Sequence, residues 1–254
     1  DDRGVRYPEA NNDMIFAIPV GSHLTQAAGL AWACKFQKSD HVALTYLGDG
    51  ASSKGDFHES LTFAGAMKLP LVFIVENNHW AISVPRAKQC AAETFAQKGI
   101  GYGVHGIQVD GNDVLAVYSA SREAVERARA GDGPTLIECV TYRLAMHTTA
   151  DDPTKYRSAE EVAEWERKDP LTRFGEYLRT KSLLVKELEQ AVEQEISAAV
   201  RGFEASPPAD PLGMFDHLHA ELPPHLRAQR EALAAWLSTR EPDGGGAAEE
   251  RPPS

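Results

Sequence analysis

Residues 44–50 read LTYLGDG, an apolar run that ends in a Gly-Asp-Gly turn. Residues 71–78 read LVFIVENN, a second apolar run that ends in an Asn pair, and Asn78 lies 29 positions after Asp49. A strand, a turn, a helix and a parallel strand together take about 30 residues. The spacing therefore predicts that Asp49 and Asn78 follow two parallel strands and lie at the same edge of one sheet.

These two turns carry hard oxygen ligands of the kind that magnesium prefers. The Gly-Asp-Gly tripeptide alone indicates little, because Asp-Gly is common in turns. Two strand-end signals at strand–helix–strand spacing are more informative. The glycines and the small residue Ala51 also leave room for a phosphate group at a helix entrance. The pattern therefore predicts a site for magnesium and a diphosphate.

Strand-like and helix-like segments alternate over the first part of the chain. We expect strands at residues 41–47, 71–75, 107–109 and 135–142. We expect helices from residue 22 or 25 to 36, at 56–67 and at 114–130. This alternation is typical of an α/β fold, in which a parallel sheet is covered by helices on both faces.

The pattern changes after residue 143. We expect an exposed loop at 148–157, followed by helices at 159–167, 171–179, 183–203 and 224–239. This predicts an α/β domain at 1–180, a helical segment at 181–240, and a disordered tail at 241–254 that is rich in Gly, Pro and Glu. The chain begins with Asp1 and meets a strand-like run at 14–18 almost at once, so we expect upstream residues of the natural protein to be missing.

Composition narrows the class of protein. The formal net charge of −11 argues against a nucleic-acid-binding protein and against binding to an anionic membrane surface. No apolar run approaches the roughly 18 residues of a transmembrane helix. Cys34, Cys90 and Cys139 are far apart and odd in number, which indicates reduced thiols in a cytoplasmic protein.

Four stretches together resemble one enzyme family. They are residues 48–59 (GDGASSKGDFHE), 76–85 (ENNHWAISVP), 106–113 (GIQVDGND) and 142–158, which begins YRLAMHTTADD. They resemble the α subunit of the thiamin-diphosphate-dependent decarboxylating component of 2-oxo acid dehydrogenase complexes, the branched-chain 2-oxo acid and pyruvate dehydrogenase family. The resemblance covers roughly residues 15–178 and implies a thiamin-diphosphate-binding α/β fold.

The resemblance implies roles for particular residues. It gives Asp49, the side chain of Asn78 and the backbone carbonyl of Trp80 as Mg²⁺ ligands. The remaining implied contacts to the cofactor come from Gly48, Gly50 and Ala51 at the diphosphate, Ile18 and Val20 at the aminopyrimidine, and His147 in the active-site loop. In that loop His147 reaches the diphosphate and the reacting centre, and Arg143 organises the loop through Asp151.

The same resemblance implies partners. In this family a separate β subunit contributes the glutamate that activates the aminopyrimidine ring, so we expect an α2β2 heterotetramer that is active only when assembled. The thiamin cofactor promotes loss of carbon dioxide from a 2-oxo acid. The acyl fragment then passes to a lipoyl group on the acyltransferase component.

Three questions stay open at the level of sequence. Residues 81–83 and 142–144 favour branched-chain 2-oxo acids, whereas Glu76 and Asp49 also resemble the pyruvate enzymes. A non-catalytic scaffold subunit would retain the fold without the cofactor. A single-chain thiamin enzyme such as a transketolase would need the activating glutamate and a second pyrimidine-binding domain on the same polypeptide.

Overall fold

The computed structural model describes residues 18–185 and 187–239. The tail expected at 241–254, and all but Ile18 of the strand-like run expected at 14–18, lie outside the described residues. The described residues belong to two compact units, 18–185 and 187–239, which are treated separately below.

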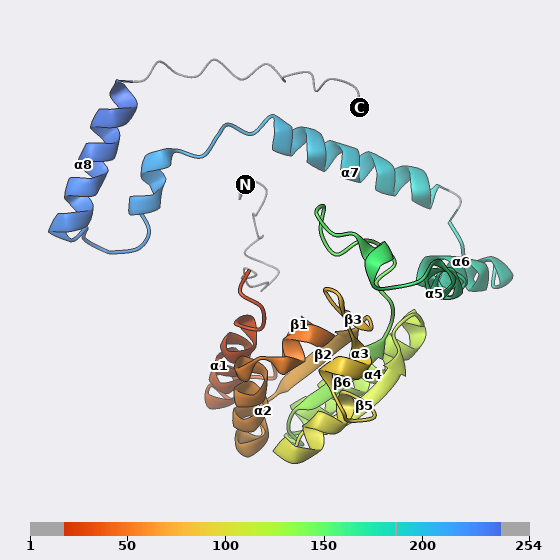
Figure 1. Ribbon diagram of the computed structural model, residues 1–254. Coiled ribbons are helices and arrows are strands. Elements are labelled where there is room, and N and C mark those ends of the chain that lie inside the picture. The colour runs from red at the N-terminus through yellow and green to blue at the C-terminus, as the bar shows by residue number, and fades with distance from the viewer. Residues whose placement is uncertain (1–17, 186, 240–254) are drawn as a thin grey trace. The chain divides into compact units, whose positions relative to one another are not determined.

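A four-stranded parallel sheet forms the centre of the first unit. Its strands are β1 (Ala43–Gly48), β2 (Leu71–Asn77), β6 (Thr135–Val140) and β5 (His105–Asp110), in the spatial order β1-β2-β6-β5. Gly48 pairs with Glu76, and Asn77 pairs with Val140. The turns that follow β1 and β2 therefore emerge at the same carboxyl edge of the sheet (Figure 1).

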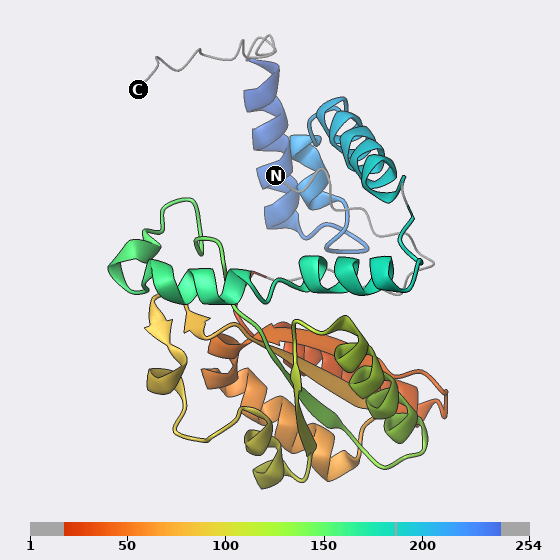
Figure 2. The same cartoon turned by 90° about the vertical axis from the view of Figure 1, so that its right-hand side faces the viewer.

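Helices cover both faces of this sheet, as Figures 1 and 2 show. Helices α1 (His23–Phe36) and α2 (Gly55–Met67) pack against one face, in a buried cluster that includes Leu24, Leu61 and Phe73. Helix α4 (Val114–Arg129) packs its alanines on the other face, against Val72 and Ile137. Successive β2 residues enter opposite clusters, because side chains alternate along a strand. The predicted α/β class with a parallel sheet is confirmed.

Most predicted elements occur within a few residues of their expected bounds. The first strand begins at Ala43 instead of residue 41, and the helix expected from residue 183 begins only at Leu188. The connection from β2 to β5 was not predicted in detail. It contains a two-residue antiparallel pair, β3 (Trp80–Ala81) and β4 (Val84–Pro85), then α3 (Arg86–Gln89) and η4 (Ala96–Tyr102). Strands of two residues are too short to produce a periodic pattern.

The first unit continues with η5 (Pro153–Lys155), α5 (Ala159–Glu166) and α6 (Pro170–Thr180). The second unit contains α7 (Leu188–Glu204), η6 (Pro211–Phe215) and α8 (Pro224–Ser238); η6 lies against α8, and Phe215 is buried. Nowhere in the described residues is a helix long and apolar enough to cross a membrane. All three cysteines carry free thiols, as expected, and burial raises the pKa of Cys139 to about 11.

Candidate cofactor site

Asp49 is a buried carboxylate directly after β1. It is the first residue of the short helix η3 (Asp49–Ser53), and only 1% of its surface is exposed. Its two oxygens accept hydrogen bonds from the Gly50 amide (3.0 Å) and from Gln89 Nε2 (3.1 Å). Burial raises the pKa of Asp49, and these hydrogen bonds only partly oppose that shift. A bound cation would favour the charged carboxylate that burial disfavours.

The two glycines beside Asp49 have different surroundings. A Cβ atom on Gly48 would meet no heavy atom within 4 Å, so its Cα borders open space. A Cβ atom on Gly50 would lie 2.8 Å from the Cβ of Ala81, which is too close for two carbon atoms. Gly50 thus allows η3 to pack against β3, whereas Gly48 leaves room at the predicted diphosphate position. Ala51 is buried within η3.

Asn78 begins a tight turn that leads into β3. Its Oδ1 accepts a hydrogen bond from the Trp80 amide at 3.1 Å. The turn places His79 in the left-handed backbone region, with φ 70°, and Ile82, which lies between β3 and β4, also has a positive φ of 56°. The indole of Trp80 is buried and donates to the hydroxyl of Tyr142 at 3.2 Å. The turn thereby presents one carboxamide oxygen and one backbone carbonyl at the edge of the sheet.

The structure brings Asp49 to this turn. Helix η3 packs against both β2 and β3, and the charges of His79 and Arg143 lie close enough to Asp49 to lower its pKa. The three residues expected to bind Mg²⁺ therefore lie on adjoining turns of one sheet edge. Their assignment as ligands stays a prediction, because a metal ion is the observation that would test it.

Arg143 connects this edge to the loop that follows β6. Its guanidinium donates to the carbonyls of Trp80 (3.3 Å) and Ile82 (2.7 Å), and to the hydroxyl of Tyr156 (2.9 Å). The Tyr156 hydroxyl in turn donates to Asp151 Oδ2 at 2.6 Å. The hydrogen-bonded path from Arg143 to Asp151 thus runs through Tyr156.

His147 lies in this loop with an exposed side chain. Its backbone amide donates to Asp151 Oδ2 at 2.8 Å, so the same carboxylate holds both His147 and Tyr156. Arg157 donates to the carbonyls of Leu144 (2.7 Å) and Ala145 (3.0 Å), which fixes the start of the loop. The backbone of the loop is therefore held from within, while the imidazole of His147 remains accessible.

Ile18 and Val20 precede α1 and are 88% and 60% exposed. A Cβ atom on the neighbouring Gly21 would lie 3.4 Å from the Cβ of Lys54, so this segment passes beside the end of η3. Two apolar side chains exposed near η3 are compatible with contact to an aromatic ring. That contact stays a prediction.

Several residues that contact the predicted site were not expected from the sequence. Gln89 contacts Asp49, and nothing in the sequence indicates it. The ring of His79 lies 5.2 Å from that of Trp165, and its Nε2 is buried without a hydrogen-bond partner in the described part of the chain. Burial lowers the pKa of His79. Glu138 accepts a hydrogen bond from Asn77, next to the predicted site. The sequence could have indicated this residue, since it is the one acidic residue in the otherwise uncharged strand β6 (TLIECV).

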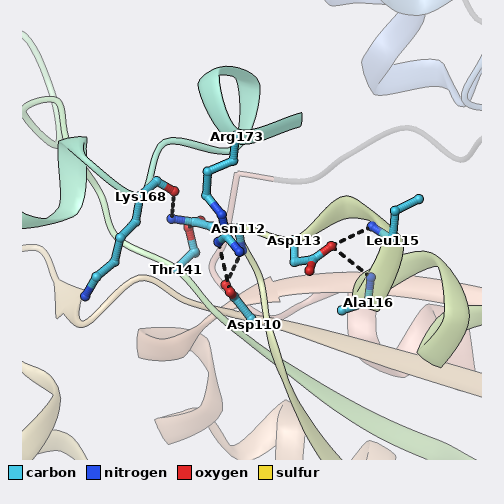
Figure 3. A network of polar contacts seen from close by, with 8 residues as sticks. All are labelled: Asp110, Asn112, Asp113, Leu115, Ala116, Thr141, Lys168 and Arg173. Carbon is cyan, nitrogen blue, oxygen red and sulfur yellow. Dashed lines mark hydrogen bonds and ion pairs between the residues drawn. The ribbon is translucent and has the colours of Figure 1, made fainter. Parts of the chain in front are cut away.

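A second polar network, shown in Figure 3, attaches α6 and the segment that precedes it to the ends of β5 and β6. Asn112 is buried; it donates to the carbonyl of Lys168 (3.0 Å) and accepts from the hydroxyl of Thr141 (2.6 Å). Arg173 and Asp110 form an ion pair at 2.9 Å. These contacts position α5, and Trp165 on α5 stacks on Tyr142 with 5.4 Å between the rings.

The donor set at this edge is compatible with magnesium. It offers one carboxylate, one carboxamide oxygen and one backbone carbonyl, to which diphosphate and water oxygens would be added. Within residues 18–185 and 187–239, no three His, Cys, Asp or Glu side chains are grouped as metal ligands. The predicted site has a single carboxylate, so it differs from such a cluster. The buried Asp49 and the open space beside Gly48 both suit a metal diphosphate.

Comparison with known proteins identifies the family. Residues 3–210 match the family described as "Dehydrogenase E1 component". This chain belongs to the dehydrogenase E1 component family. The match covers the sheet, the predicted site and the loop that carries His147, so the family resemblance drawn from the four stretches is confirmed.

Curated relatives in the E1 family are named as α subunits. The chain is 47% identical over 234 residues to a pyruvate dehydrogenase E1 component subunit alpha from Staphylococcus epidermidis, across 90% of this chain and 63% of that protein. The Staphylococcus aureus protein of that name gives the same values. A 3-methyl-2-oxobutanoate dehydrogenase subunit alpha from Mycobacterium tuberculosis is 50% identical over 229 residues, across 87% of this chain and 62% of that protein. The chain thus spans less than two thirds of these relatives.

Proposed function

We propose that this chain is the α subunit of a thiamin-diphosphate- and Mg²⁺-dependent 2-oxo acid dehydrogenase that acts on a branched-chain 2-oxo acid. One observation carries the proposal. The buried carboxylate of Asp49 lies at the same sheet edge as the Asn78–Trp80 turn in a member of the E1 family. Asp49 forms none of the ion pairs of the described residues, and a bound cation would offset the cost of burying its carboxylate.

In this proposal Asp49, Asn78 and the carbonyl of Trp80 hold Mg²⁺, and the space beside Gly48 admits the diphosphate. Bound thiamin diphosphate supplies a nucleophilic carbon for the 2-oxo group and an electron sink for the departure of carbon dioxide. The chain's own contribution is to fix the metal and to keep the carboxylate of Asp49 away from water. The hydrogen bonds of Arg143 hold the metal-binding turn against the loop.

The loop residues have a separate role in the proposal. Asp151 orients the backbone at His147, so that the accessible imidazole can reach the diphosphate and the reacting centre. Assembly with a β subunit as α2β2 would supply the glutamate for the aminopyrimidine ring. It would also cover the exposed Ile18 and Val20, which we propose contact that ring. The acyl group would leave on the lipoyl group of an acyltransferase component, and we propose a cytoplasmic location.

Substrate choice rests on sequence similarity. Residues 81–83 and 142–144, and the 50% identity to the 3-methyl-2-oxobutanoate enzyme subunit, support a branched-chain substrate. The alternative is pyruvate, which the 47% identity to the staphylococcal subunits supports. Comparison of kcat/KM for pyruvate and for 3-methyl-2-oxobutanoate, with the α and β subunits co-expressed, decides between them.

The decisive test of the function is a calorimetric titration of thiamin diphosphate, with and without Mg²⁺, into the assembled α and β subunits. We expect binding that requires Mg²⁺ and is lost in Asp49→Ala. Asp113→Ala is the matched control, because it removes a carboxylate that caps α4 outside the predicted site. Absence of binding to a well-folded wild-type assembly would favour the scaffold alternative.

A further inference from the structure

Glu138 is a charged residue in the middle of the buried strand β6, with no exposed surface. Its Oε1 accepts a hydrogen bond from Asn77 Nδ2 at 2.7 Å, and its Oε2 accepts one from the Ala96 amide at 3.0 Å. The ion pairs of the described residues do not include Glu138. Both neighbours are donors, so the site is built for a group with two acceptor oxygens.

Asn77 extends this contact to the metal-binding turn. Its Oδ1 accepts a hydrogen bond from the His79 amide at 3.2 Å, and its backbone carbonyl accepts one from Thr141 at 2.9 Å. The side chain of Asn77 is also buried. Its orientation is therefore fixed from two sides, because its amide group must face Glu138 while its oxygen faces His79.

One residue of that turn has an unfavourable backbone conformation. His79 adopts φ 70°, in the left-handed region that a residue with a Cβ atom seldom occupies. Backbone of this kind persists where the surrounding structure holds it in place. The residue in this strained conformation, His79, is the one whose amide donates to Asn77. Asn78 and Trp80, which flank His79, are the two ligands that the turn would offer to Mg²⁺.

We propose that Glu138 is a positioning residue that acts through Asn77 to hold the Asn78–Trp80 turn in its metal-binding conformation. The part that concerns the metal rests on the proposed function, whereas the part that concerns the turn does not. This role would explain why strand β6 contains a carboxylate that has no contact with solvent.

The variant Glu138→Gln tests this chain of hydrogen bonds, because it exchanges one acceptor for a donor. Glu138→Gln keeps the shape of the side chain but offers one oxygen and one amide group to two donors. If the new amide faces Asn77, Asn77 must turn its oxygen toward it, and the mismatch passes to the His79 amide. In the double variant Glu138→Gln/Asn77→Asp each of these hydrogen bonds again joins a donor to an acceptor, with the oxygen of the new amide group facing the Ala96 amide. The new amide donates to the new carboxylate, which still accepts from His79.

The experiment uses the full chain assembled with its β subunit and has two readouts. The first is hydrogen exchange at the His79 and Trp80 amides without cofactor. The second is the Mg²⁺ concentration for half-maximal binding of thiamin diphosphate. We expect Glu138→Gln to accelerate exchange and to raise that concentration by about 10–100-fold, the usual effect of losing a residue that orients a metal ligand. The double variant should reverse most of both changes.

Ile137→Ala is the matched control, because it removes buried apolar volume from the same strand without touching these hydrogen bonds. We expect it to lower the melting temperature but to leave both readouts near wild type. The proposal is overturned if Glu138→Gln leaves exchange unchanged, if Ile137→Ala changes it equally, or if the double variant fails to restore it. A wild-type assembly that binds no thiamin diphosphate would refute the proposed function, and the exchange readout would still decide whether Glu138 positions the turn.

Discussion

Gly48 and Gly50 flank Asp49, and we predict that their replacement by alanine has opposite consequences. A Cβ atom on Gly50 would lie 2.8 Å from the Cβ of Ala81, whereas one on Gly48 would meet no heavy atom within 4 Å. Gly48 has φ −73° and ψ 161°, which alanine adopts without strain. Gly50 does not have a positive φ either, so the two positions differ in the contact with Ala81 and not in backbone strain.

The magnitude follows from the overlap. Ala81 is the second residue of the two-residue strand β3, so relief of the contact requires movement of η3 or β3 backbone. Forcing an extra methyl group into such a contact costs about 1–3 kcal/mol. For a chain of this size, each kcal/mol lowers the melting temperature by about 2–4 °C. Gly48→Ala should leave stability unchanged or raise it by up to about 1 kcal/mol, because alanine restricts the unfolded chain.

Gly48→Ala, the variant that keeps its stability, should be the one that loses affinity for the cofactor. If the diphosphate occupies the open space beside Gly48, the methyl group of Gly48→Ala weakens thiamin diphosphate binding in a protein that is fully stable. Thermal unfolding in EDTA measures the first effect, and calorimetric titration with Mg²⁺ measures the second. The double variant Gly50→Ala/Ala81→Gly removes the overlap and should recover most of the lost stability.

Two results would refute this reasoning. Equal melting temperatures for Gly50→Ala and Gly48→Ala would mean that η3 and β3 are not in the close contact described. Unchanged cofactor affinity in Gly48→Ala would mean that the diphosphate lies elsewhere.

The other predictions concern the carboxylate, the loop and a helix cap. Burial raises the pKa of Asp49 above 3.8, so its contribution to the free energy of unfolding falls as pH rises past that value. Asp49→Asn should therefore raise the melting temperature of the metal-free protein more at about pH 7 than at about pH 4, and an equal gain at both would contradict this. His147→Ala should leave Mg²⁺-dependent cofactor binding largely intact but reduce kcat, and wild-type turnover would mean that the histidine is structural. Arg143→Lys cannot span its three acceptors; loss of about 1–3 kcal/mol and faster proteolysis of the loop are expected, checked by urea unfolding and timed digestion. Asp113→Ala removes the cap of α4, whose carboxylate accepts from two backbone amides (Figure 3), and should cost about 1 kcal/mol by urea unfolding, while Asp113→Asn retains most of it.

The sequence alone was enough to predict the parallel sheet and the edge at which the site lies. Continuous apolar runs at β2 and β6 and helical segments between strands are local patterns, and strand–helix–strand connections bring carboxyl ends to one edge. Asp49 and Asn78 could be paired for this reason, since their spacing is fixed by the chain. Family membership could likewise be read from short stretches near those turns.

The contacts between segments were decided only by tertiary structure. Examples are the hydrogen bonds between Gln89 and Asp49, between Arg143 and Tyr156, and between Glu138 and Asn77, each of which joins residues at least 13 positions apart. The hydrogen bond from Tyr156 to Asp151, which completes the path from Arg143, spans five positions. The left-handed backbone at His79 also has no sequence signal, because the residue is not glycine. Local propensity sets which residues form strands and helices. The direction of a hydrogen bond across a sheet edge depends on packing between segments, which exists only once the chain has folded.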